Sequence, residues 1–119
     1  MIRLEREEAG LLPSAQEIDN ASKPISQHLD EHLEVKHTKG AKEKQIRTYR
    51  TRVEHICTDC DWKYLKDVSA HEFEMWRNKH ASEFSPKTLN EYLAAIKGMF
   101  SWLEKLDLIK SNPLKGVDK

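Results

Sequence analysis

Residues 85–106 read SPKTLNEYLAAIKGMFSWLEKL, and this stretch predicts a long amphipathic helix. Ser85 is a favourable N-cap residue and Pro86 suits the first helical position, so the helix is expected to begin here. One face carries a nearly unbroken apolar stripe, made up of Leu89, Tyr92, Leu93, Ile96, Met99, Phe100, Leu103 and Leu106. The opposite face holds Lys87, Asn90, Ala94, Lys97, Gly98 and Ser101. The small residues on that face would let another group approach the helix backbone closely.

The rest of the chain predicts three further helices. They are expected over residues of about 25–36 and 42–58, and from residue 70 onwards. Gly40 supplies a stop for the first of these helices. Ser69 followed by Glu72 is the signature of a capping box at the start of the third. Since no stretch alternates with strand period, the sequence predicts an all-α fold of four main helices, a single domain over residues 24–117 that follows a flexible tail or linker over residues 1–23.

Charge is unevenly distributed along the chain, although the formal net charge is zero. Residues 36–52 carry seven basic and one acidic side chain, whereas residues 1–35 carry three basic and eight acidic ones. On a wheel of the second predicted helix, one face is basic and hydroxyl-rich. It holds Lys44, Arg47, Thr48, Thr51 and His55, with Arg52 at its edge. Such a stripe is typical either of a polyanion-binding surface or of a plain solvated face.

Cys57 and Cys60 suggest a zinc site only weakly, because a structural zinc site usually needs a second ligand pair at suitable spacing. The nearby histidines, His55, His71 and His80, do not reproduce one. Cys57 also lies on the apolar face of its helix and is interpreted as a small hydrophobic residue. The sequence therefore predicts neither a metal ion nor a cofactor.

Three histidines near the start of the predicted domain, His28, His32 and His37, are interpreted as surface residues. No signal peptide and no stretch of membrane-spanning length is visible in the sequence. The expected compartment is the reducing cytoplasm, and no membrane partner is predicted.

The order and spacing of these helices resemble the core-binding domain of tyrosine recombinases, the SAM-like N-terminal domain of phage integrases. The resemblance is carried by residues 85–103 together with LIKSNPL (108–114) and DWKYLKDV (61–68), and it covers residues 24–117. It implies an orthogonal helical bundle that clamps the core site in double-stranded DNA during integration and recombination. It also implies that a separate C-terminal catalytic domain of the same protein, absent from this stretch, cuts and rejoins the strands. No catalytic residue is expected here, and Tyr49, Tyr64 and Tyr92 lie in the wrong domain to be the nucleophile.

Two groups of residues are predicted to contact DNA, because this family presents its second and fourth helices to the duplex. The first group consists of Lys44, Arg47, Thr48, Thr51 and Arg52, and the second of Lys87, Thr88, Asn90 and Lys97. Cationic and hydroxyl side chains suit phosphate oxygens, and an amide suits a base edge. The alternative is a helical protein-interaction module without a DNA role, and a small zinc module is a third possibility. The predicted form of this stretch is a monomer.

Overall fold

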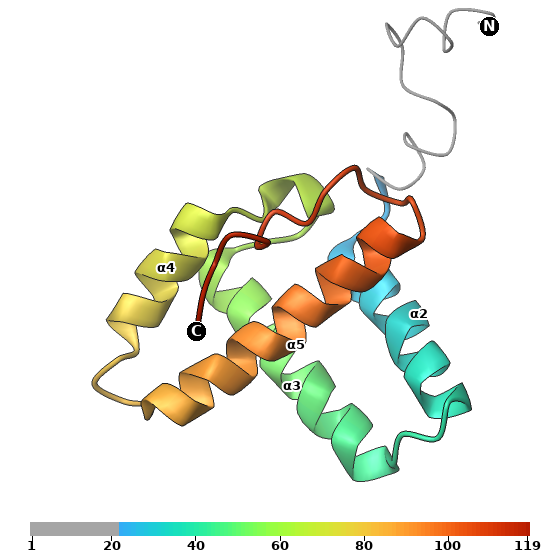
Figure 1. The fold of residues 1–119 in the computed structure, drawn as a ribbon, viewed down its shortest axis with the longest axis horizontal. Coiled ribbons are helices and arrows are strands. Elements are labelled where there is room, and N and C mark those ends of the chain that lie inside the picture. The colour runs from blue at the N-terminus through green and yellow to red at the C-terminus, as the bar shows by residue number, and fades with distance from the viewer. Residues whose placement is uncertain (1–21) are drawn as a thin grey trace, which may run out of the picture.

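The computed structural model describes residues 22–119, in which the chain forms four α-helices and one short 3-10 turn (Figure 1). These elements are α2 (Ile25–Thr38), α3 (Glu43–Cys60), η2 (Leu65–Asp67), α4 (Ala70–Lys79) and α5 (Pro86–Lys105). The predicted all-α fold with four main helices is therefore confirmed. Most of the predicted tail, residues 1–21, lies outside the described part of the chain. Between residues 22 and 119 no helix is long and apolar enough to cross a lipid bilayer.

The end of α2 follows the predicted glycine stop. Gly40 adopts a positive φ of 100°, which a side chain would disfavour. Its N–H donates to the carbonyl of His37, and the N–H of Ala41 donates to the carbonyl of Lys36, both at 3.0 Å. These two bonds form a Schellman motif that satisfies the last carbonyls of the helix. The helix runs to Thr38, two residues beyond the expected end.

The predicted serine caps are present at the starts of α4 and α5. The hydroxyl of Ser69 accepts from the N–H of Glu72 at 3.0 Å, and that of Ser85 accepts from the N–H of Thr88 at 3.2 Å. The carboxylate of Glu72 accepts a hydrogen bond from the indole N–H of Trp62 at 2.5 Å. The serine half of the predicted capping box is therefore confirmed, while the glutamate side chain instead satisfies a buried tryptophan.

Helix α3 lies at the centre of the bundle, where it packs against α2, α4 and α5, and α5 also packs against α2. In Figure 1, α5 crosses α3 instead of running alongside it. The apolar stripe of α5 faces this crossing, with Leu89, Leu93, Ile96, Met99, Phe100 and Leu103 all buried. Each such side chain contributes about 1.5–3 kcal/mol by leaving water. Two members of the predicted stripe differ: Tyr92 is half-buried, and Leu106 is 49% exposed and follows the end of the helix.

The segment after α5 is part of the core, which the sequence did not indicate. Leu114 and Val117 are buried, and so is the polar side chain of Asn112. The amide nitrogen of Asn112 donates to the carbonyl of Lys97 and to the hydroxyl of Ser101, both at 3.0 Å. These bonds attach the segment to the outer side of α5. Of the small residues predicted there, Ser101 is bonded to this segment, while Ala94, Gly98 and Ser101 all remain exposed.

The interpretation of His28 and His32 as surface residues is wrong. Both are buried, because they lie on the same face of α2 as Ile25, Leu29 and Leu33. Ile25, Leu29 and Leu33 already repeat at helical spacing, and the two histidines, each three residues after an apolar one, widen the same buried face.

Candidate nucleic-acid interface

The first group of predicted contact residues surrounds a hollow of about 240 Å³ on the surface of α3. The hollow is lined by Arg47, Thr48, Thr51, Arg52 and Tyr92. Lys44 lies one turn nearer the start of α3 and is exposed. Residues spaced three and four apart share a helix face, which explains why these side chains lie together. The stripe predicted on the second helix is therefore present as one surface.

The second group lies around a neighbouring hollow of about 500 Å³ at the N-terminal half of α5. This hollow is lined by Lys87, Asn90, Glu91, Ala94 and Lys119. Thr88 is also in the first turn, but its hydroxyl accepts a hydrogen bond from the hydroxyl of Ser85 at 3.1 Å. The structure thus gives Thr88 a part in the helix cap.

Lys97 has a structural partner as well. Its ammonium group donates to the carbonyl of Val117 at 2.7 Å, and the side chain is half-buried. This bond holds the C-terminal segment against α5. Lys97 therefore has a structural role. Lys87, by contrast, is exposed and has no ion pair among residues 22–119.

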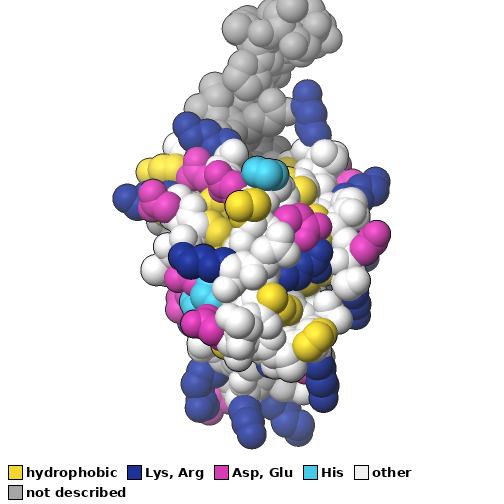
Figure 2. Space-filling model, turned by 90° about the vertical axis from the view of Figure 1, so that its left-hand side faces the viewer, with side chains coloured by type: hydrophobic (Ala, Val, Ile, Leu, Met, Phe, Trp, Pro, Cys, Tyr) yellow, Lys and Arg dark blue, Asp and Glu magenta, His cyan; other side chains and the backbone are white. Residues whose placement is uncertain are grey.

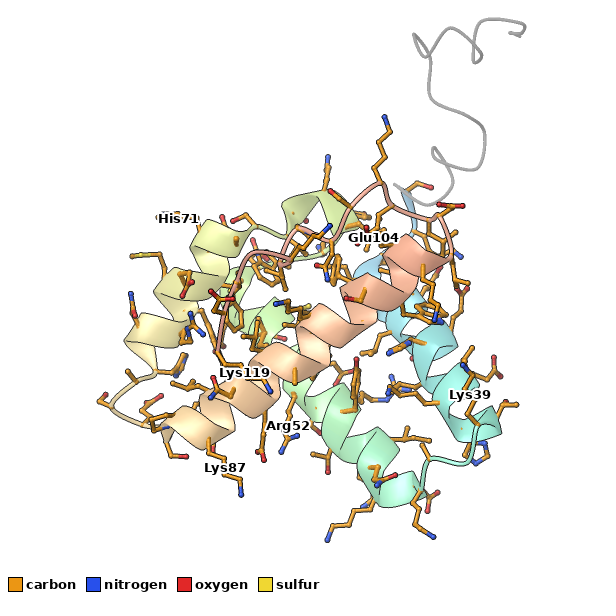
Figure 3. The ribbon with its side chains drawn as sticks, in the orientation of Figure 1. Lys39, Arg52, His71, Lys87, Glu104 and Lys119 are labelled. Atoms are coloured by element: carbon orange, nitrogen blue, oxygen red, sulfur yellow. The ribbon has the colours of Figure 1, made fainter. Side chains whose placement is uncertain are left out.

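An ion pair joins the two hollows. Arg52 Nη2 of α3 lies 3.0 Å from Glu91 Oε1 of α5. Figure 3 places Arg52, Lys87 and Lys119 near one another beside the N-terminal half of α5. The combined surface, to which the exposed Lys44 is added, is called the α3–α5 face and consists of Lys44, Arg47, Thr48, Thr51, Arg52, Lys87 and Asn90. Seven of the nine predicted contact residues belong to it; Glu91 and Tyr92, which also line it, were not predicted as contacts.

The positive charge of residues 36–52 is divided between two sides of the bundle. Arg50 pairs with Asp30 of α2 at 2.6 Å, and the ammonium group of Lys36 lies 4.8 Å from the ring centre of Tyr49. Within the described residues, by contrast, Lys44 and Arg47 have no ion pair. Lys and Arg side chains also project from the lower end of the molecule in Figure 2. Unpaired cations are the ones that an incoming anion meets at full charge.

A cluster of histidines and aromatic rings lies behind the α3–α5 face. His55 Nδ1 is hydrogen-bonded to the hydroxyl of Tyr92 at 3.0 Å, and its Nε2 lies 3.1 Å from Asp59 Oδ2. The same carboxylate oxygen accepts from the indole N–H of Trp76 at 2.9 Å and lies 3.3 Å from His80 Nε2. The hydrogen bond from Trp76, followed by the charge of the histidines, lowers the pKa of Asp59. The cluster holds Tyr92 in place through its hydrogen bond to His55. The only signal of this cluster in the sequence was the i, i+4 spacing of His55 and Asp59.

The two cysteines are half-buried free thiols. Burial, and then the neighbouring Cys60 and Glu54, raise the pKa of Cys57 to about 12, and burial also raises the pKa of Cys60 to about 11. Both thiols are therefore harder to deprotonate than an ordinary cysteine, and the thiolate is the form that binds zinc. Between residues 22 and 119 no set of three or more histidine, cysteine or carboxylate side chains is placed to hold a metal ion.

The chain was also compared with known proteins. The model of one protein family, described as the phage integrase N-terminal domain, matches residues 26–119. Comparisons with curated proteins and with solved structures give no match. The family match covers all four helices and the buried segment that follows α5. The chain therefore belongs to the phage integrase N-terminal domain family.

Proposed function

We propose that this chain binds double-stranded DNA through the α3–α5 face. Its role is to clamp the core site of a tyrosine recombinase during DNA integration and recombination, as a monomeric and cytoplasmic domain over residues 24–117. A C-terminal catalytic domain of the same protein is its second partner. The chain itself is non-catalytic and requires no cofactor.

One observation carries this proposal: exposed cations without ion pairs lie on a single face together with hydroxyl and amide groups. Lys44, Arg47 and Lys87 supply the charge, and Thr48 and Asn90 supply hydrogen-bonding groups beside them. Phosphate oxygens accept from such donors, and an amide can pair with an adenine edge in the major groove. The match to an integrase N-terminal domain supports the choice of DNA as the polyanion.

The environment of Tyr49 supports a non-catalytic role. The hydroxyl of Tyr49 donates to the carbonyl of Ala95 at 2.5 Å, and burial raises its pKa. A tyrosine nucleophile needs a lowered pKa or an adjacent base together with cations at the scissile phosphate. Tyr49 has the opposite environment.

An amide-shift titration with a duplex of mixed sequence tests the proposal and maps the surface in one experiment. We expect shifts on α3 and α5 at low salt, and an affinity that falls steeply as salt rises because phosphate contacts release counterions. The double variant Lys44→Glu/Arg47→Glu should bind at least about tenfold more weakly. Lys110→Glu is the control, since Lys110 is exposed and lies outside the α3–α5 face.

Equal losses from both variants would mean that binding is diffuse charge attraction. Absence of shifts on α3 and α5 at low salt would favour the alternative of a protein-interaction module. A nicked suicide duplex should trap no covalent protein–DNA adduct. An adduct that disappears on changing a tyrosine to phenylalanine would contradict the non-catalytic assignment.

A further inference from the structure

A carboxylate lies in the middle of the α3–α5 face. Glu91 lines the hollow that also contains Lys87 and Asn90, and it pairs with Arg52, which lines the hollow on α3. The side chains of Arg52 and Glu91 are 31% and 41% exposed, so both are accessible to a ligand. Glu91 is thus surrounded by residues assigned to DNA contact, and it carries the charge that phosphate repels.

This position is costly for a surface that only attracts phosphate. A carboxylate has no proton to donate to a phosphate oxygen, and the two like charges repel each other at short range. Glu91 also occupies one side of the Arg52 guanidinium, at 3.0 Å from Nη2, and so removes a cation from the phosphate-binding set. A surface evolved for charge attraction alone would be improved by losing Glu91.

Base edges, unlike phosphates, carry N–H groups that can donate hydrogen bonds to a carboxylate. The amino group of cytosine lies in the major groove, and guanine, its partner in the base pair, offers two acceptors that suit an arginine. Arg52 and Glu91 therefore match this base pair: the guanidinium can donate to guanine, and the carboxylate beside it can accept from cytosine. The ion pair also holds the guanidinium in place before DNA arrives, which reduces the entropy lost on binding.

We propose that Arg52 and Glu91 form the base-reading pair of the α3–α5 face, and that Glu91 suppresses binding to DNA of arbitrary sequence. Lys44, Arg47 and Lys87 around the pair then supply the phosphate contacts. This inference rests on the proposed DNA-binding function. It assigns base recognition and phosphate binding to different residues of the same surface.

The first test is the affinity for a duplex of mixed sequence. Glu91→Gln keeps the shape of the side chain and removes its charge, so it should tighten this binding about threefold to tenfold. The slope of log affinity against log salt should become steeper by about one, because Arg52 is released to contact a phosphate. Glu34→Gln is the matched control: Glu34 is exposed on α2 and its loss changes the net charge by the same amount. It should alter affinity by less than about twofold.

A double-mutant cycle tests the pairing of the two residues. Arg52→Gln leaves the carboxylate of Glu91 unpaired towards DNA, so it should bind the mixed duplex more weakly than the wild type. Adding Glu91→Gln should restore affinity by more than Glu34→Gln does in the same background. Selection from a randomised duplex library should show a preferred base pair for the wild type that is lost in Glu91→Gln.

Two results would overturn the inference while leaving DNA binding intact. One is a Glu91→Gln variant that binds the mixed duplex as Glu34→Gln does, or more weakly. The other is an unchanged base preference in the library selection. If the wild type binds no duplex at all, the proposed function fails and this inference fails with it. Duplex binding by the wild type that is lost in Lys44→Glu/Arg47→Glu separates the first two cases from this one.

Discussion

At the scale of single residues, the hydroxyl of Tyr49 links three helices. It donates to the carbonyl of Ala95 in α5 and lies 3.1 Å from His32 Nε2 in α2. Since the tyrosine proton is directed to the carbonyl, His32 Nε2 must carry the proton in the second bond. His32 Nδ1 is buried without a hydrogen-bond partner among the described residues, so a second proton there would be unpaired. His32 is therefore held neutral.

This arrangement predicts a loss of stability in mild acid. Burial, and secondarily the charge of Lys36, lower the pKa of His32 from 6.5 to about 4. Between these two values the unfolded chain binds a proton at His32 and the folded chain does not. The stability is thus fully present above pH 6.5 and falls as the pH is lowered towards 4, by at most on the order of 3 kcal/mol.

Urea unfolding between pH 7 and pH 4.5 measures this effect. His32→Gln should lower the stability at pH 7 but reduce its further decline in acid. His37→Gln, at an exposed position, should keep the wild-type pH dependence. An identical decline in wild type and His32→Gln would show that other groups cause the acid sensitivity.

At the scale of the helix, α5 combines a buried stripe with one close approach by another element. A Cβ atom added to Gly98 would lie 3.4 Å from the hydroxyl of Tyr49, which is an ordinary van der Waals contact. Gly98 otherwise weakens the helix, because glycine loses more backbone freedom on folding than alanine does. The cost to the helix therefore outweighs the steric need for glycine.

We predict that Gly98→Ala stabilises the protein by about 0.5–1 kcal/mol. Gly98→Val should instead destabilise it, because a branched side chain displaces the Tyr49 hydroxyl from Ala95. Denaturant midpoints of the two variants measure both effects. A Gly98→Ala variant less stable than the wild type would mean that the contact with Tyr49 tolerates no additional atom.

The helix ends give a second prediction at this scale, with opposite signs at two positions. Gly40 and Asp107 both have positive φ, 100° and 62°, and each follows the end of a helix. The N–H of Leu108 donates to the carbonyl of Leu103 at 3.0 Å, so the end of α5 repeats the Schellman pattern of α2. The same conformation favours glycine at both sites.

Gly40→Ala should therefore lower the free energy of unfolding by about 1 kcal/mol, and Asp107→Gly should raise it by up to about 1 kcal/mol. Thermal or urea unfolding checks both values. The same sign for the two substitutions would contradict the backbone argument.

At the scale of the whole molecule, the last segment of the chain closes the bundle. Asn112 uses its side-chain oxygen to accept from the N–H of Leu114 at 2.8 Å, and its own N–H donates to Glu104 Oε1 at 3.0 Å. With its amide nitrogen bonded to Lys97 and Ser101, it fixes the segment that buries Leu114 and Val117.

Asn112→Ala should destabilise the protein by about 2–4 kcal/mol, because buried partners lose their hydrogen bonds and the apolar side chains behind them lose contacts. Amide hydrogen exchange should rise first in residues 112–117. Ser111→Ala, next to it but exposed, should change the stability by less than about 0.5 kcal/mol. Equal stability of Asn112→Ala and the wild type would show that the segment adds nothing to the fold.

Local signals in the sequence determined the number of helices, most of their ends and the basic stripe on α3. Ser85 and Gly40 act through hydrogen bonds to residues a few positions away, and Pro86 acts through its fixed φ, so their effects can be predicted without knowing the fold. The apolar stripe of α5 likewise predicted which of its faces is buried. The face of α3 that carries Arg47 and Thr51 was also predictable, because it depends only on helical spacing.

The tertiary structure decided which polar groups pair across elements, since these partners are far apart in the chain. Arg52 and Glu91 are 39 residues apart, Tyr49 and Ala95 are 46 apart, and Lys97 and Val117 are 20 apart. Helix spacing gives the side on which each residue lies but not the element that faces it. The crossing of α3 and α5 thus brought residues of the two predicted groups onto one surface, and Glu91 lies within that surface. It also placed Lys97 beside the C-terminal segment.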